Sequence, residues 1–231
     1  MVQPSKPLKT RGEFHKKAYQ YVKERIMERT YKPGQDLSDS QIANELNISR
    51  TPVRDGLRRL QHEGFLITQS GKGWKVYSLT LEDIQEIFEI KVELEGMIAR
   101  KAALCENKKA QSKMRETLQR MKHAFEMNDL EAWRKADMEL HDVIFEMSGN
   151  ERATRMVKDL NEQWYRVRIG LIAMEGRMER SNREHQAIVE NIIAGNPERA
   201  ETEMRVHLIK VREELERVLV NLVLPFAQEG I

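Results

Sequence analysis

The chain has 231 residues, of which 33% are charged and 40% are hydrophobic, as expected for a folded protein of about two domains. No apolar run approaches the ~20 residues that span a bilayer, and the polar residues 1–12 lack the apolar core of a signal peptide. We therefore expect a cytoplasmic protein with no membrane segment. The single Cys105 excludes an internal disulfide; it is either an ordinary helical thiol or a reactive or metal-binding one.

The net charge of +2 conceals an asymmetry between the two parts of the chain. Residues 1–79 contain 15 Lys+Arg and 8 Asp+Glu, whereas residues 80–231 contain 24 and 29, so the first part is basic and the second is acidic. Clustered basic charge is what binding to nucleic-acid phosphates requires. We expect residues 1–12 to be a flexible tail and residues 13–79 to be a DNA-binding domain.

Residues 38–60 predict two short helices joined by a tight turn. Apolar residues recur at helical spacing on both sides of Asn47, at Ile42, Ala43, Leu46, Val53, Leu57 and Leu60. Ser49 is suited to cap the second helix, which should begin at Ser49 or Arg50. Its outer face then carries Arg50, Thr51, Arg54 and Arg58. Arginine can bond guanine O6 and N7 at once, so the second helix is a candidate recognition helix for the major groove.

A predicted β-hairpin follows this motif. Residues 65–69 and 74–77 are β-prone and flank Ser70-Gly71-Lys72-Gly73. A helix-turn-helix followed by such a hairpin indicates a winged helix with three helices and a β-hairpin wing. The alternative is a solvated basic helix beside an unrelated hairpin.

Residues 31–76 resemble the DNA-binding domain of the GntR family of bacterial transcription regulators. The Pro33-Gly34 turn, the run of residues 49–54 and the Glu63-Gly64-Phe65-Leu66 exit all match. The resemblance implies base or phosphate contacts from Arg50, Thr51 and Arg54, with Ser70 and Gly71 at a wing tip in the minor groove. Ser40 stands where many members of the family have an arginine that contacts DNA, so operator preference can differ here.

Residues 80–224 predict an all-helical bundle of about six helices, which makes the protein mainly α. Thr80 and Asp83 match a capping box that begins a helix. Later breaks are expected at residues 128–129, 148–150, 175–176 and 195–197.

Four polar residues interrupt the apolar stripes of these helices. Asp137 and His141 are four residues apart and share one helix face. His185 and His207 each lie eleven residues from Asn196, in the expected turn between two antiparallel helices, so their rings should face one another. The four can bind a divalent transition metal, Zn²⁺ first and Ni²⁺ or Mn²⁺ as alternatives. Alternatively, Asp137 pairs with His141 and the other two are core histidines with hydrogen-bond partners.

The second half of the chain is similar to the FCD-type effector domain found in one GntR subfamily. The similarity is carried by Asp137, His141, residues 184–200 and His207. It implies a metal at the floor of a helical pocket, where a small carboxylate effector completes the coordination. Lys91 stands where the family usually has an arginine that holds the effector's carboxylate. It is either an inward effector contact or a lysine whose head group reaches solvent.

The main hypothesis is a homodimeric transcription regulator, a repressor by resemblance, that is not an enzyme. Its partners would be double-stranded DNA with a palindromic operator and a small organic acid. One alternative is a metal-dependent hydrolase with an added DNA-binding domain. Another is a metal-sensing regulator without an organic effector.

Overall fold

The computed structural model describes residues 11–69, 73–172 and 174–219, and the chain divides into two compact units, residues 1–79 and 80–231. Most of the expected tail lies outside the described residues. Helix α1 (Arg11–Met27) already includes Arg11 and Gly12, two residues that the sequence analysis assigned to that tail.

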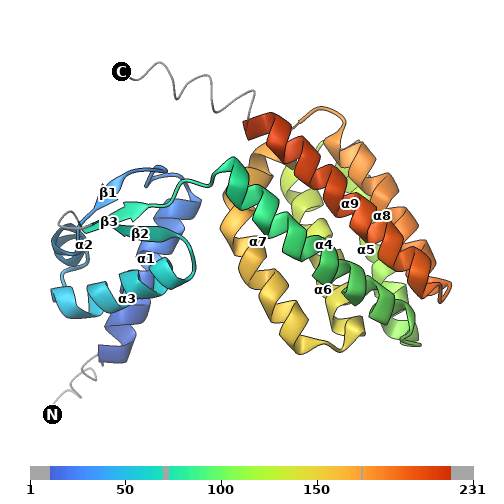
Figure 1. Cartoon of the computed structure of the whole chain (residues 1–231), viewed down its shortest axis with the longest axis horizontal. Helices are drawn as coiled ribbons and strands as arrows, with labels where there is room; N and C mark the ends of the chain where they lie inside the picture. The colour runs from blue at the N-terminus through green and yellow to red at the C-terminus, as the bar shows by residue number, and fades with distance from the viewer. Residues whose placement is uncertain (1–10, 70–72, 173, 220–231) are drawn as a thin grey trace, which may run out of the picture. The chain divides into compact units, whose positions relative to one another are not determined.

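The first unit contains three helices and a small antiparallel sheet (Figure 1). After α1 come β1 (Asp36–Leu37), α2 (Asp39–Leu46), α3 (Arg50–His62), β2 (Leu66–Gln69) and β3 (Gly73–Val76). The strand order is β1-β3-β2, and Thr68 pairs with Trp74 in the expected hairpin. The sequence analysis missed β1, because two residues are too few to show the alternation that identifies a strand.

The turn between α2 and α3 depends on local side-chain and backbone chemistry. The Ser38 hydroxyl caps α2 by accepting a bond from the backbone N–H of Gln41. Asn47 ends α2 with a left-handed backbone, which asparagine tolerates better than most residues. Ser49 occupies the expected N-cap position of α3, but its hydroxyl makes no capping hydrogen bond. Its predicted position was therefore right and its predicted bond was wrong.

Helix α3 is held against α1 at very close range. A Cβ atom on Gly56 would lie 2.9 Å from the backbone oxygen of His15 and 2.9 Å from the backbone nitrogen of Tyr19. Only glycine permits this approach. Apolar residues of α1, α2, α3 and the sheet complete one buried core beneath α3, including Val22, Ile42, Leu57 and Phe65.

The second unit is a bundle of six helices among its described residues. They are α4 (Leu81–Ala103), α5 (Lys108–Glu126), α6 (Leu130–Ser148), α7 (Glu151–Ile172), α8 (Arg177–Ile193) and α9 (Pro197–Val218). Helices α4 and α9 lie side by side, and α8 packs along α9 (Figure 1). Helix α6 packs against both α4 and α5, so that α4, α6, α8 and α9 can contribute residues to one interior.

The helix boundaries follow the predicted breaks. Thr80 and Asp83 form the full capping box, with each side chain bonded to the other residue's backbone N–H. Asp129, Gly149, Gly176 and Asn196 stand at helix ends as expected. The turn after α4 was not marked in the sequence analysis, although Asn107 caps α5 there.

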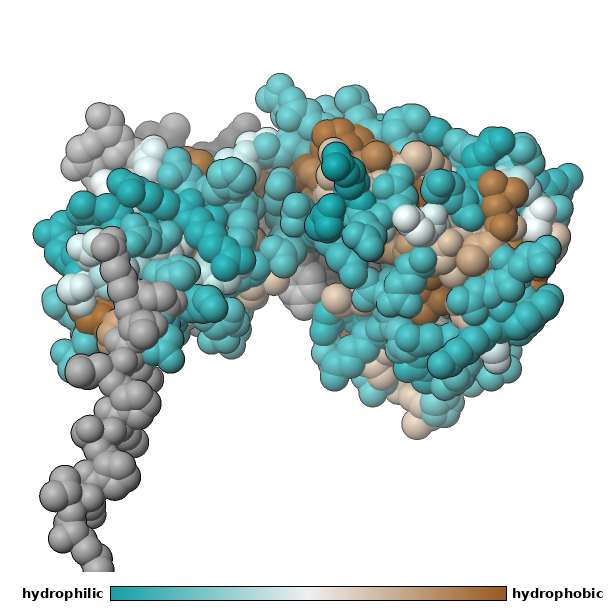
Figure 2. All heavy atoms as spheres, turned by 90° about the horizontal axis from the view of Figure 1, so that it is seen from below, coloured by the Kyte–Doolittle hydropathy of each residue, from teal (hydrophilic) through white to brown (hydrophobic). Residues whose placement is uncertain are grey.

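Much of the surface is polar. In the view of Figure 2, hydrophobic residues form small groups among polar side chains. The large hydrophobic side chains that are most exposed are Leu104, Met127 and Met156. No helix within the described residues is both long enough and apolar enough to span a bilayer.

Candidate functional site

Three histidines from different helices converge inside the second unit. His141 lies on α6, His185 on α8 and His207 on α9, and one potential ligand atom from each lies within 4.8 Å of the others. Nε2 of His141 is 3.1 Å from Nε2 of His185. The rings of His185 and His207 have centroids 4.5 Å apart, which agrees with their equal spacing from the turn at Asn196.

The other ring nitrogen of each histidine is held by an oxygen. Nδ1 of His141 lies 3.3 Å from Oε2 of Glu95, and Nδ1 of His207 lies 2.8 Å from Oε2 of Glu184. Nδ1 of His185 lies 3.2 Å from the Ser181 hydroxyl. Such bonds set the ring orientation and leave Nε2 as the nitrogen available for a metal, which is how most metal-binding histidines are arranged.

Asp137 lies beside this histidine cluster, defined as His141, His185 and His207. It is buried, and its Oδ1 is 3.4 Å from Nε2 of His185. A metal bound to nitrogen and oxygen at about 2.0–2.2 Å places neighbouring ligand atoms roughly 3.0–3.5 Å apart. The 3.1 Å separation within the histidine cluster fits that requirement, so the cluster can hold a metal ion, and the 3.4 Å separation places Asp137 next to one of its members.

Burial gives His185 and His207 the neutral state that a metal-binding imidazole needs. It lowers the pKa of His185 well below its usual range, and the neighbouring His207 acts in the same direction. Burial also lowers the pKa of His207, although the bond to Glu184 opposes it. Both rings are thus neutral at pH 7 and keep a lone pair on one nitrogen.

Lys91 on α4 points into the bundle. Its side chain is 2% exposed, and its ammonium donates to Glu95 and to Asn161. The alternative of a lysine that reaches solvent is therefore wrong. Burial alone would raise the pKa of Glu95, but the charge of Lys91 and the bond to His141 outweigh it and bring that pKa to about 2. The Glu95 carboxylate thus joins Lys91 to the histidine cluster.

The first unit presents a second candidate site on α3. Arg50, Thr51, Arg54 and Arg58 are all exposed along this helix. Ser40, the departure from the resemblance, is exposed on α2. Ser70 and Gly71, the expected wing tip, lie outside the described residues. The exposed arginine row is the kind of surface that bonds phosphates and base edges.

Two protein-family models match the chain. The model described as "Bacterial regulatory proteins, gntR family" matches residues 14–76, and the model described as "FCD domain" matches residues 86–210. The chain belongs to the GntR family, in the group with an FCD domain.

Individual relatives agree with this membership of the GntR family. YdhC, an HTH-type transcriptional regulator of Bacillus subtilis, is 26% identical over 203 residues, which are 87% of this chain and 90% of YdhC. RspR, an HTH-type transcriptional repressor of Escherichia coli, is 21% identical over 87% of this chain and 88% of RspR. The solved structure of E. coli McbR/YncC covers 88% of this chain and 97% of its own, with a TM-score of 0.70 at 19% identity, and so shares the fold.

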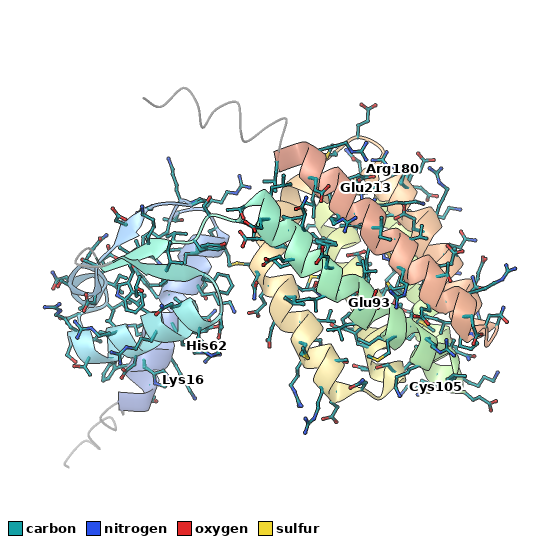
Figure 3. All side chains as sticks on the ribbon, in the orientation of Figure 1. Lys16, His62, Glu93, Cys105, Arg180 and Glu213 are labelled. Atoms are coloured by element: carbon teal, nitrogen blue, oxygen red, sulfur yellow. The ribbon has the colours of Figure 1, made fainter. Side chains whose placement is uncertain are left out.

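These findings confirm that this GntR regulator is mainly helical, with a winged helix-turn-helix followed by a bundle of about six helices. They also confirm a transcription regulator rather than an enzyme, so the hydrolase hypothesis is set aside. The other three histidines are not part of the cluster. His123 is exposed on α5, while the half-buried His15 on α1 and the exposed His62 at the end of α3 belong to the first unit (Figure 3).

The sequence analysis missed the residues that orient the histidine cluster in this GntR regulator. Glu95 lies four residues after the buried Lys91 on α4, and Ser181 lies four residues before the buried His185 on α8. Residues four apart share one helix face, so this spacing could have revealed both. Glu184 could not be found in that way, because its partner His207 is on another helix. Glu184 is in turn 3.5 Å from Nη2 of the buried Arg177 and 3.5 Å from Nζ of Lys210.

Proposed function

We propose that this GntR regulator is a homodimeric repressor whose affinity for a palindromic operator is controlled by a small carboxylate bound at a metal in the FCD domain. The observation that carries the proposal is the histidine cluster with inward Nε2 nitrogens beside Asp137, in a chain whose family reads DNA with its other domain. RspR, a repressor of similar length, supports the direction of control.

The DNA contacts are assigned to the exposed row on α3. Arg50, Arg54 and Arg58 would reach phosphates or guanine edges, Thr51 would make a shorter contact, and Ser70 and Gly71 would enter the minor groove. One short helix reads few base pairs, so two copies related by a two-fold axis are needed for a selective site. A regulator that reads the bacterial chromosome acts in the cytoplasm.

The metal is assigned to Asp137, His141, His185 and His207. Three imidazoles and one carboxylate favour Zn²⁺, with Ni²⁺ and Mn²⁺ as alternatives, and leave coordination positions open. The bound ion would supply a positive charge that a carboxylate ligand can reach. Binding of this cation is favoured because His185 and His207 are neutral and Glu184 is ionised.

Lys91 is assigned as the second contact to the effector. Its buried ammonium is bonded to Glu95 and Asn161, so an incoming carboxylate would have to share Lys91 with them. Such a rearrangement involves α4, which packs against α6, α7, α8 and α9. A ligand can alter DNA affinity only if it favours one arrangement of the protein over another. A change in the packing of α4 is a physical route to that preference.

The test combines metal analysis with DNA binding by the full chain. Elemental mass spectrometry of the purified protein should find about one transition-metal ion per chain. Fluorescence anisotropy should show binding to the DNA upstream of its own gene that is ~10³-fold or more tighter than to random DNA at the same salt. A panel of lactate, malate and citrate is then added to the metal-loaded protein. Equal binding to both DNAs would refute the function.

One observation favours the second candidate, a regulator that senses the metal alone. The charge of Lys91 is already neutralised by Glu95, so this cation is less available to an organic acid. In that case operator affinity would follow the concentration of Zn²⁺, Ni²⁺ or Mn²⁺ and would not respond to any carboxylate in the panel. An exposed-histidine variant, His123→Ala, serves as the control for both candidates, because it leaves the metal ligands intact.

A further inference from the structure

A carboxylate on α2 holds two of the arginines that project from α3. Oδ2 of Asp39 accepts bonds from Nε of Arg54 at 3.0 Å and from Nη2 of Arg54 at 2.5 Å. The same oxygen is 3.4 Å from Nη2 of Arg50. Asp39 itself is only 8% exposed, while the side chains of Arg54 and Arg50 are 48% and 60% exposed.

The position of Asp39 is well defined by its local structure. It is the first residue of α2, directly after the Ser38 cap, where a negative charge is favourable at the positive end of the helix. Burial by itself would raise the pKa of Asp39. The hydrogen bonds that its carboxylate accepts from Arg54 and from its own backbone N–H outweigh burial and lower this pKa. The carboxylate is therefore charged at neutral pH.

The geometry of the bond decides which part of Arg54 remains for DNA. A guanidinium has five N–H groups, and Asp39 accepts from Nε–H and from one N–H of Nη2. Two N–H groups on Nη1 and one on Nη2 remain. These three N–H groups lie at the tip of the side chain. From there they can donate to O6 and N7 of one guanine at the same time.

We propose that Asp39 is a positioning residue for DNA recognition, which orients Arg54 and Arg50 before they meet the bases. The inference rests on the proposed use of α3 to read DNA. Holding a long side chain in its bound rotamer reduces the entropy lost on binding. The resulting gain in affinity is expected only on the preferred operator, because the end-on contact between Arg54 and a guanine forms only there. The carboxylate also repels phosphates, so it weakens binding to all DNA by adding a negative charge.

These two effects predict opposite changes when Asp39 is replaced. Asp39→Ala should bind random DNA at least as tightly as the parent, with a log–log salt slope about one unit steeper if one more phosphate is neutralised. Its affinity for the preferred operator should fall, so that the ratio of operator to random affinity drops about tenfold or more, as expected for weakening one two-bonded base contact. A loss of fold would instead weaken both.

The experiment uses the full chain, an operator selected with the parent protein from a random duplex library, and a scrambled duplex of equal length. Anisotropy titrations at several salt concentrations give both affinities. Asp36→Asn is the matched control, because it removes the same charge from an exposed residue of this unit whose carboxylate lies 3.9 Å from Lys75. It should raise both affinities and leave their ratio unchanged. Asp39→Asn, which keeps the shape of the side chain, replaces Asp39→Ala if the latter does not fold.

A double-mutant cycle with Arg54→Ala distinguishes positioning from general stabilisation. If Asp39 acts through Arg54, its replacement should change the affinity ratio much less in the Arg54→Ala background than in the parent. An unchanged ratio in folded Asp39 variants, or equal losses in both backgrounds, would overturn the proposal. Absence of any sequence preference in the parent protein would overturn the proposed function as well, so the two failures are distinguishable.

Discussion

Oε2 of Glu95 lies 3.3 Å from Nδ1 of His141, while the other oxygen of the same carboxylate accepts a bond from Lys91. One buried side chain thus connects the metal candidate to the effector candidate. The connection runs from α4 to α6 and could transmit a change at either residue to the other. The first prediction follows directly from it.

Glu95→Gln should weaken metal binding by about 10–100-fold, because an amide orients His141 less strongly than a carboxylate does. It should also destabilise the fold by several kcal/mol, since the buried Lys91 loses its counter-charge. Competitive metal titration and thermal unfolding measure the two effects. Glu89→Gln, an exposed change on the same helix, should alter neither. Metal affinity equal to that of the parent would show that Glu95 does not contribute to metal binding.

Removal of the metal should lower the melting temperature of the parent protein. An ion that binds the folded state alone stabilises it by about 2.7 kcal/mol at a concentration 100 times its dissociation constant. EDTA should therefore lower the melting temperature of the parent but have little effect on His185→Ala, which lacks a ligand. His123→Ala, with its ligands intact, should respond to EDTA as the parent does. If EDTA shifts His185→Ala as much as the parent, that histidine does not hold the ion.

Acid should weaken the first unit through Glu63. The carboxylate of Glu63 accepts from the Tyr19 hydroxyl at 2.7 Å and from Arg59 at 2.8 Å. Burial would raise its pKa, but these bonds outweigh it and lower the pKa from 4.5. The unfolded chain then takes up the proton first, so this stabilisation is complete above about pH 4.5 and is lost as the pH falls through the folded-state value.

Glu63→Gln should therefore be less stable than the parent at pH 7, and the difference should shrink towards pH 3. Thermal unfolding followed by circular dichroism over this range provides the measurement. Glu13→Gln, an exposed change on α1, is the comparison. A stability difference that is constant with pH would mean that the carboxylate's charge contributes nothing.

Gly56→Ala should destabilise the winged helix. The added methyl group would lie 2.9 Å from backbone atoms of His15 and Tyr19, and the backbone yields less readily than a flexible side chain. Overpacking of this kind costs about 1–3 kcal/mol. Because α3 would be displaced from α1, operator affinity should fall together with the unfolding temperature. A variant as stable as the parent would show that α1 and α3 can separate without cost.

Much of the architecture follows from local sequence patterns. The apolar spacing around Asn47 identified α2 and α3, and the Thr80–Asp83 capping box identified the start of α4. These features depend on residues within one or two helical turns of each other, so a linear reading detects them. The two-residue strand β1 escaped because its pairing with β3 is the only reason it is a strand.

For the candidate sites, the sequence by itself determined which residue types are available and which helix faces they share. Sequence spacing predicted the row of arginines on α3 and the matching heights of His185 and His207, which are equally far from Asn196. It could do so because helical geometry converts spacing along the chain into position in space. Only the tertiary structure decided that Glu95 joins Lys91 to His141 and that Asp39 holds Arg54. The links from Glu95 to His141 and from Asp39 to Arg54 cross between helices. Such contacts depend on how whole helices pack, and no local period records that packing.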